Sequence, residues 1–388
     1  MPRRVLAVVA AVALMGGGLA GCGRSEEPVA PPAVLRLGAL VPLTGASAGT
    51  GASMVSAFEM AVREANDVGG VLGHRVELVS QDDACDPGTA VEEANKLIAK
   101  DITVSVGGLC SAATVPTLKV FRDAGVPMII PGSNSTDLLA PRYDSIFLLA
   151  GTTAIEAKRA VAWMRPLGSR RVALVGDGTS FSGTIVAAAA ETVRKPGSGV
   201  TLAAELKLSQ GATGYPRVVQ AVQRTRADMV FYTGYYEEAA TLIRDLRAAG
   251  YAGKIMLSDG GVDPMLLKVL TPAQAEGVYG LALPLAEFEP RAAAWAARYK
   301  TLTGQPPGPF TMQAYDAVQL ALDAVRRAGS LDRAAVRKAI ATTAPGDLGL
   351  LSGPSKFNPD GTQVNSTFIL LEIRDSAFTL APARAPGG

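Results

Sequence analysis

Two short segments, QDDACDP at residues 81–87 and GGLCS at residues 107–111, decide how the rest of the chain is interpreted. Each follows an apolar run that is typical of a strand, at residues 76–79 and 102–106. Each also precedes a run that is typical of a helix. In an open α/β sheet, the turns after the carboxyl ends of the strands form the rim where ligands bind. Both segments are therefore predicted to lie at such a rim.

Each segment contains a cysteine, Cys85 in the first and Cys110 in the second. A disulfide between them would clamp two neighbouring rim loops. Such a bond could preorganise half of a binding site, or it could act only as a structural staple. We interpret it as a staple and expect the residues beside it to form the site.

The composition limits the class of protein. The chain has 388 residues, which favours two lobes, and 48% hydrophobic with 19% charged residues suits folded cores. A net charge of +2 without a basic stripe argues against nucleic acid as a partner. His74 is the one histidine, so histidine-based metal or acid–base chemistry has little support, and we expect no cofactor and no metal.

The N-terminus predicts export. Basic residues precede a short apolar run, as in a signal peptide over residues 1–21. The sequence LAGC at 19–22 resembles a bacterial lipobox, in which the signal is cut before the cysteine, here Cys22, and that cysteine is lipidated. The alternative is an ordinary signal peptide with an incidental cysteine, but the small residues before Cys22 favour the lipobox. Residues 22–34 are then a polar tether, and Cys85 with Cys110 remain as an even pair in an oxidising compartment.

From Leu35 onward, strand-like and helix-like runs alternate, which predicts an α/β fold with mostly parallel sheets and right-handed crossovers. A second series of the same kind begins near Gly151 and is a pseudo-repeat of the first. Beyond Pro284 the pattern changes to helices, followed by a last strand over 367–373. Residues 381–388 are expected to be a disordered tail.

With these elements placed, the chain resembles the leucine/isoleucine/valine-binding proteins of bacterial ABC importers, over about residues 35–380. The resemblance rests on motifs that occur in the same order in that family: DDACDP at 82–87, LCS at 109–111, YTGY at 232–235, LRAAG at 246–250, and PF at 309–310 with Tyr315.

The resemblance implies a type I periplasmic-binding-protein fold of two Rossmann-like lobes joined by three crossovers, near Gly151, Pro284 and Leu351. The first lobe would comprise residues 35–151 with 284–351. The second would comprise residues 152–283 with 352–380. The ligand would lie in the cleft between the lobes.

A free amino acid carries a carboxylate beside an ammonium group, and a selective site must satisfy both after removing their water. By resemblance, Ser111 and the loop of Gly132, Ser133 and Asn134 hold the carboxylate, with Asn134 where the family usually has threonine. Ser111 and Asn134 could instead be helix caps. Asp259 matches the acidic residue that holds the ammonium, although it is shorter than the glutamate of the leucine-binding relatives. The alternative for Asp259 is a solvated turn residue.

Three aromatic residues, Phe181, Tyr235 and Phe310, match the cleft wall of the family. Thr50 stands where relatives carry tyrosine or tryptophan in the first loop. This difference removes a side-chain wall and weakens any inference about which amino acid binds.

The implied mechanism has no bond-making step. We expect an amino acid, branched-chain or otherwise apolar, to bind the first lobe, after which the second lobe closes by a hinge motion. The closed form would then dock on the permease subunits of an ABC importer. The protein is expected to be a monomer, outside the cytoplasm and held at a membrane by lipid on Cys22.

Parts of the sequence also fit other functions. The same fold could bind amides, urea or aromatic acids, or it could act as a sensory receptor. Residues 45–49 fit the G-x-S-x-G pattern of hydrolases, with Ser47 as nucleophile. A hydrolase of that kind needs a histidine late in the chain, whereas His74 lies early, at a strand start. We therefore expect that the chain is not an enzyme.

Overall fold

The computed structural model describes residues 34–344, 346, 348–353 and 356–382. Its first sheet is parallel and five-stranded, with the order β2-β1-β3-β4-β5. These strands are β1 (Leu35–Val41), β2 (Val76–Asp82), β3 (Val104–Ser105), β4 (Met128–Ile130) and β5 (Ile146–Leu148). Strand β1, which lies between β2 and β3, is almost wholly buried, as its mostly apolar sequence LRLGALV predicts for a strand covered on both faces.

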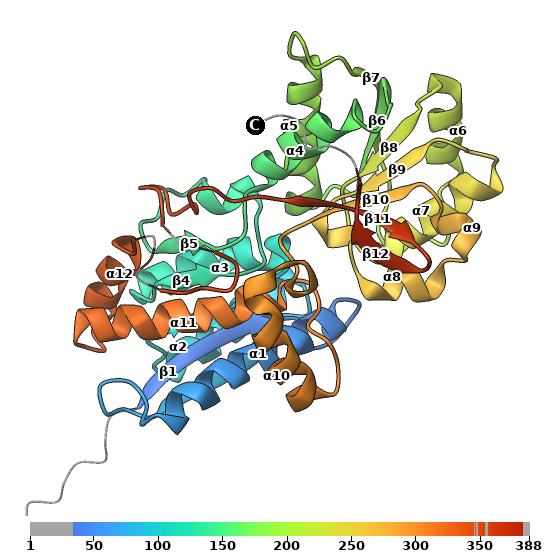
Figure 1. The fold of residues 1–388 in the computed structure, drawn as a ribbon. Helices are drawn as coiled ribbons and strands as arrows, with labels where there is room; N and C mark the ends of the chain where they lie inside the picture. The colour runs from blue at the N-terminus through green and yellow to red at the C-terminus, as the bar shows by residue number, and fades with distance from the viewer. Residues whose placement is uncertain (1–33, 345, 347, 354–355, 383–388) are drawn as a thin grey trace, which may run out of the picture. The chain divides into compact units, whose positions relative to one another are not determined.

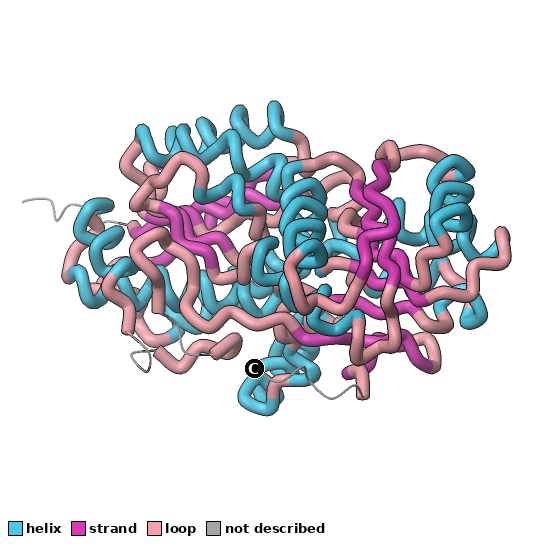
Figure 2. The backbone as a smooth tube through the Cα atoms, turned by 90° about the horizontal axis from the view of Figure 1, so that it is seen from above, coloured by secondary structure: helices cyan, strands magenta, loops and turns pink. Residues whose placement is uncertain are grey.

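Helices cover both faces of the first sheet (Figures 1 and 2). Helix α2 packs beside α3, whereas α1 packs beside α11, which comes from much later in the chain. The elements of this group are α1 (Ala48–Asp67), α2 (Pro87–Ala99), α3 (Ser111–Asp123), η1 (Thr136–Leu139), η3 (Ala286–Phe288), η4 (Pro290–Ala292), α10 (Ala293–Thr303), α11 (Thr311–Ala328) and α12 (Arg333–Ala341). We call this sheet and these helices the first lobe.

The second sheet repeats the strand order of the first. Its order is β12-β11-β10-β9-β8-β6-β7, so the parallel part, read from β7, matches the order β2-β1-β3-β4-β5. These strands are β6 (Arg171–Gly176), β7 (Thr201–Lys207), β8 (Met229–Tyr232), β9 (Lys254–Leu257), β10 (Val278–Ala282), β11 (Ile369–Arg374) and β12 (Ala377–Leu380). The predicted α/β fold with mostly parallel sheets, and its pseudo-repeat, are confirmed.

Two apolar clusters cover the two faces of the second sheet. The helices around it are α4 (Thr153–Met164), α5 (Ser180–Arg194), α6 (Pro216–Thr225), α7 (Tyr236–Ala248), η2 (Asp259–Gly261), α8 (Pro264–Val269) and α9 (Pro272–Ala275). We call this sheet and these helices the second lobe. The pattern analysis did not predict β5, β10, β12, α6, α8 or α9, most of which are short.

The chain returns to the first lobe at α10 to α12, and its contacts with this lobe continue after α12. Buried Asp316 of α11 accepts hydrogen bonds from the backbone N–H groups of Leu351 (2.9 Å) and Ser352 (2.7 Å). Thr362 then forms a parallel bridge with Leu148 of β5. Contact with the first sheet therefore extends beyond residue 351, where the sequence placed the last crossover.

The turn before Cys85 is held by its own acidic residues. Ala84 and Cys85 both have positive φ angles, of 49° and 55°. The Asp82 carboxylate accepts the N–H of Ala84 (2.8 Å), and that of Asp83 accepts the N–H of Cys85 (2.9 Å), which stabilises this uncommon conformation.

The predicted disulfide joins Cys85 and Cys110, with their Cα atoms 5.3 Å apart. The loops that it joins are not direct neighbours as predicted, because β1 lies between β2 and β3. The bond therefore spans the carboxyl end of β1.

Helix α1 begins at Ala48, within a stretch, residues 42–51, that is rich in glycine, serine and threonine. The glycines suggested a loop, but Gly51 has a packing role. A Cβ atom on Gly51 would lie 1.7 Å from the carbonyl oxygen of Pro42. Only glycine lets the first turn of α1 pack this closely against the strand-to-helix loop.

Some residues at each end of the chain are outside the described residues. The predicted signal peptide (1–21), Cys22 and the tether up to residue 33 are outside the described residues, as are 383–388 of the predicted tail. Ala381 is described, and its N–H bonds the carbonyl of Leu370 (3.0 Å). None of the described helices has both the length and the apolar character needed to cross a membrane.

Removal of the disulfide should lower stability without unfolding the first lobe. The bond closes a sequence separation of 25 residues, for which the loop-entropy relation gives about 3.5 kcal/mol. Urea denaturation of the Cys85→Ala, Cys110→Ala double variant should show this loss. Wild-type protein in reductant is the control and should match the variant, and equal stability of the oxidised and reduced forms would contradict the expectation.

Asp316→Ala should cost about 2–4 kcal/mol, because it leaves the buried N–H groups of Leu351 and Ser352 without their acceptor. Asp323→Ala, on the same helix, removes a partly exposed ion pair with Arg327 and should cost less than about 1 kcal/mol. Urea denaturation compares the two variants. Similar losses would show that Asp316 does not hold the last crossover.

Candidate functional site

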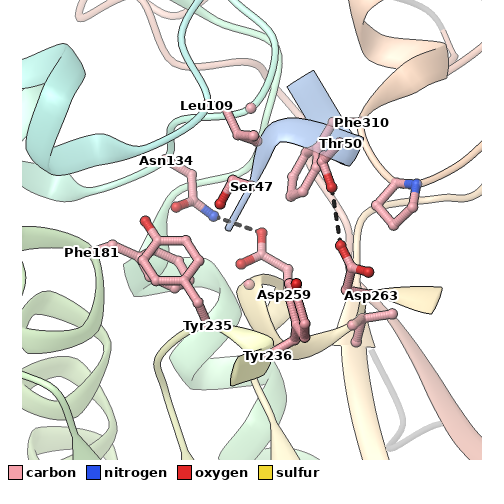
Figure 3. A pocket seen from close by; sticks show the side chains of 14 residues that line it. Ser47, Thr50, Leu109, Asn134, Phe181, Tyr235, Tyr236, Asp259, Asp263 and Phe310 are labelled. Carbon is pink, nitrogen blue, oxygen red and sulfur yellow. Dashed lines mark hydrogen bonds between the residues drawn. The ribbon is translucent and has the colours of Figure 1, made fainter. Parts of the chain in front are cut away.

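Loops from the carboxyl ends of both sheets line one small cavity of about 30 Å³ (Figure 3). Such loops form the binding crevice of open α/β sheets, close to where the strand order reverses. The first lobe supplies residues that follow β1, β3 and β4 and residues that precede α11, and the second lobe supplies residues that follow β6, β8 and β9. The lining residues are Ser47, Thr50, Leu109, Gly132, Asn134, Phe181, Tyr235, Tyr236, Asp259, Gly260, Val262, Asp263, Pro309 and Phe310.

A hydrogen bond between Asn134 and Asp259 crosses the cavity. The side-chain amide of Asn134, after β4, donates to Oδ2 of Asp259, at the start of η2, over 2.9 Å. Both side chains are almost completely buried, with exposed fractions of 1% and 3%. Asp259 is therefore not the solvated turn residue that the sequence left open as an alternative.

Burial raises the pKa of Asp259 to about 7, although hydrogen bonds from the Gly260 N–H and from Asn134 act in the opposite direction. Behind Asp259 lies a second buried carboxyl group, that of Glu156 in the first turn of α4. Its Oε1 accepts the backbone N–H of Asp259 over 2.8 Å. Burial, and then the charge of Asp259, raise the pKa of Glu156 well above its ordinary value.

Ser111 and Ser133 do not line the cavity, in contrast to the other residues that the sequence predicted for the site. Oγ of Ser111, at the first residue of α3, accepts the N–H groups of Asn134 (3.3 Å) and Ser135 (3.2 Å). The Ser133 hydroxyl bonds that of Thr114 over 2.6 Å. Both hydroxyls therefore shape the loop that presents Gly132 and Asn134.

Aromatic rings form one wall of the cavity. The rings of Phe181 and Tyr235 have centroids 5.3 Å apart at 35°, so they pack as a tilted pair. Phe310 caps α11 with a φ of 61°, a conformation that is rare for a bulky residue. This backbone places the Phe310 side chain at the cavity instead of in the helix.

Thr50, one of the residues expected at the site, lines the cavity and forms a second bond between the lobes. Its hydroxyl donates to Oδ2 of Asp263 over 3.0 Å. Asp263 also accepts the N–H of Met265 and caps α8, with Pro264 as the first helical residue. The Asp-Pro pair is a recognisable helix start, but the sequence analysis did not include Asp263 or Glu156 in the site.

The hydrolase alternative fails on geometry. Ser47 lines the cavity after the carboxyl end of β1, but His74 precedes β2 at the opposite edge of the sheet. The seven residues of β1 separate these edges by roughly 20 Å. A Ser47–His74 pair cannot form. Within the described residues, no group of three or more His, Cys, Asp or Glu side chains could hold a metal ion.

Comparison with known proteins identifies the family. Residues 34–377 match the model of the family described as periplasmic binding protein. The chain belongs to this family of solute-binding proteins. Membership places it outside the cytoplasm.

Individual relatives agree with this assignment. The chain is 26% identical to the leucine-, isoleucine-, valine-, threonine- and alanine-binding protein of Pseudomonas aeruginosa, over 87% of this chain and 89% of that protein. The resemblance to Leu/Ile/Val-binding proteins that was stated from the sequence is therefore confirmed.

Solved structures share the fold. LivJ of Streptococcus pneumoniae in complex with isoleucine has a TM-score of 0.81 at 21% identity, covering 89% of this chain and 98% of LivJ. A solute-binding protein of R. palustris in complex with benzoate has a TM-score of 0.79 at 20% identity, covering 91% and 98%. These structural similarities show that the fold is shared.

The raised pKa of Asp259 should make the protein less stable as the pH rises. Between about pH 4 and pH 7 the folded protein binds a proton at Asp259 that the unfolded chain has lost, so the free energy of unfolding falls with pH. Denaturant titrations across this window should show a smaller slope for Asp259→Asn than for wild type.

Part of the slope should persist in that variant, because burial also raises the pKa values of Asp83 and Asp316 to about 6 and the pKa of Glu156 well above its ordinary value. Asp375→Asn, at an exposed turn, is the matched control and should leave the slope unchanged. An unchanged slope in Asp259→Asn would show that Asp259 is ionised throughout.

Proposed function

We propose that the chain is the solute-binding receptor of an ABC importer and that it binds a free amino acid with an apolar side chain in the cavity between its lobes. The observation that supports this most directly is the Asn134–Asp259 pair: one buried carboxyl group, held by neutral donors only, faces the cavity. A ligand ammonium group would complete this arrangement by supplying the missing positive charge.

The character of the lining supports a ligand with a cationic group. Among the lining residues that the structure describes, the charged side chains are Asp259 and Asp263, and none is lysine, arginine or histidine. A carboxylate alone, as in benzoate, would have to be buried beside these acids without a positive partner. Phe181, Tyr235 and Phe310 offer apolar surface to the ligand side chain.

The ligand carboxylate is assigned to the first lobe. Leu109 and Gly132 line the cavity next to the start of α3, where backbone N–H groups and the helix dipole favour a negative charge. In this assignment Ser111 acts indirectly, because it holds the loop that carries Asn134.

The ligand would enter only when the lobes separate. A volume of about 30 Å³ holds one or two water molecules, so it is too small for an amino acid. We therefore expect a hinge motion that breaks the Asn134–Asp259 and Thr50–Asp263 bonds and then closes the lobes on the ligand.

The remaining parts of the proposal concern where the protein acts and with what partner. We propose that a signal peptide exports the chain and that lipid is attached at Cys22. The receptor would then deliver its ligand, as a monomer, to membrane permease subunits. The lipobox-like LAGC sequence at residues 19–22 supports the anchor. The P. aeruginosa relative, named for its binding of five amino acids, supports the class of ligand.

Calorimetric titration and thermal denaturation with leucine, isoleucine, valine, phenylalanine, urea, acetamide and benzoate test the ligand class. A bound amino acid at a hundredfold excess over its dissociation constant should add about 2.7 kcal/mol to the free energy of unfolding. Asp259→Asn should weaken amino-acid binding at least about 30-fold, because the ammonium loses its ionic partner. Asp375→Asn should bind as wild type does. Stabilisation by benzoate or urea, with no response to any amino acid, would overturn the proposal.

A further inference from the structure

Glu156 is a buried acid that the cavity lining does not explain. Its side chain is fully buried, with 0% exposed, at the first turn of α4. Oε1 accepts the N–H of Asp259, which is 103 residues away in sequence. Oε2 is also buried and has no hydrogen-bond partner among the described residues. An ionised carboxylate in this place would lack both a counter-ion and donors for one of its oxygens, which is very costly.

The groups around Glu156 and Asp259 are acidic or neutral. Asp259 is the charged group that acts on Glu156, and no lysine, arginine or histidine is among the causes that shift the pKa of either acid. The pKa of nearby Tyr235, at the start of α7, is raised by burial and by negative charges. These charges include those of Asp177 after β6, Glu238 of α7 and Asp83 of the first lobe. The charges that act on Glu156 and on Tyr235 are thus negative, and the second acid is best accommodated in its neutral form.

Glu156 accepts the backbone N–H of Asp259, and the position of this N–H explains why a buried acid occurs at the start of α4. Asp259 opens the short helix η2, and its side chain crosses to Asn134 while its N–H points back to α4. The bond from Glu156 therefore fixes the backbone from which the Asp259 carboxylate reaches the cavity. A neutral acceptor can do this without adding a second negative charge behind the first.

We propose that Glu156 is a positioning residue that works as a protonated, neutral carboxylic acid: it holds the N–H of Asp259 so that Asp259 presents the only ionised carboxylate of the pair to the ligand ammonium. This inference rests on the proposed function. It narrows the class of ligand to molecules that place one ammonium group against Asp259. The proton of Glu156 stays in place when the ligand binds, and a proton that Asp259 carries below about pH 7 is released to solvent.

Two variants of nearly equal size separate the roles. Glu156→Gln keeps the acceptor oxygen and the neutral charge, so leucine affinity should stay within about threefold of wild type, with the same pH profile. Glu156→Met fills similar space but leaves the Asp259 N–H unpaired, and its affinity should fall by about 10- to 100-fold. A change of more than tenfold in Glu156→Gln would show that Glu156 is ionised, and an unchanged Glu156→Met would show that it only fills space.

A ligand-free measurement keeps this inference separate from the proposed function. The ¹³C carboxyl resonance of Glu156, assigned by its loss in Glu156→Gln, should not move between about pH 5 and pH 8. Titration near the ordinary glutamate range would overturn the inference even if amino acids bind. A constant resonance together with failure of every amino acid to bind would overturn the proposed function alone, and the neutral acid would stand.

Discussion

The Asp259 carboxyl group is buried where the two lobes meet, and no cationic side chain of the described residues lies beside it. The arrangement of the site follows from this constraint. An isolated buried carboxylate is unstable, so it must take up a proton or receive a positive partner. The described structure gives it an amide donor from Asn134, an N–H from Gly260 and, behind its backbone, the carboxyl group of Glu156, which we infer to be neutral. These groups reduce the cost of the charge but do not neutralise it. A ligand ammonium group would.

The fold brings this carboxyl to the cavity by using one strand order twice. In each sheet the order reverses at the first strand, and the loops after β3 and β4 in one sheet correspond to those after β8 and β9 in the other. Asn134 follows β4 and Asp259 follows β9, so the two residues occupy equivalent positions in the two lobes. The lobes thus contribute complementary groups, a donor and an acceptor, from matching loops.

Much of the fold and of the cavity lining was predictable from the sequence. The alternation of strands and helices gave the fold class, and the family motifs led to Asn134, Asp259 and the aromatic wall, all of which line the cavity. Glu156 was missed because an acid in the first turn of a helix is ordinary, and only the tertiary structure brings it to Asp259. Ser111 was assigned to the ligand, but its hydroxyl is used by two backbone N–H groups of the next loop. Sequence pattern identifies the loops of the rim, whereas side-chain direction depends on contacts between distant segments.

The same atoms that would hold the ligand now hold the lobes together. Oδ2 of Asp259 accepts the Asn134 amide across the cavity. A carboxylate accepts several hydrogen bonds, so a ligand ammonium group would bind Asp259 beside this amide and supply the positive charge that the amide lacks. A ligand shifts the hinge only by the difference in its affinity for the open and closed forms. Because the unliganded lobes already share this bond, the lobes would have to break it before a ligand enters the cavity. Affinity thus depends on how weakly the empty lobes hold each other, as well as on the contacts that the ligand makes.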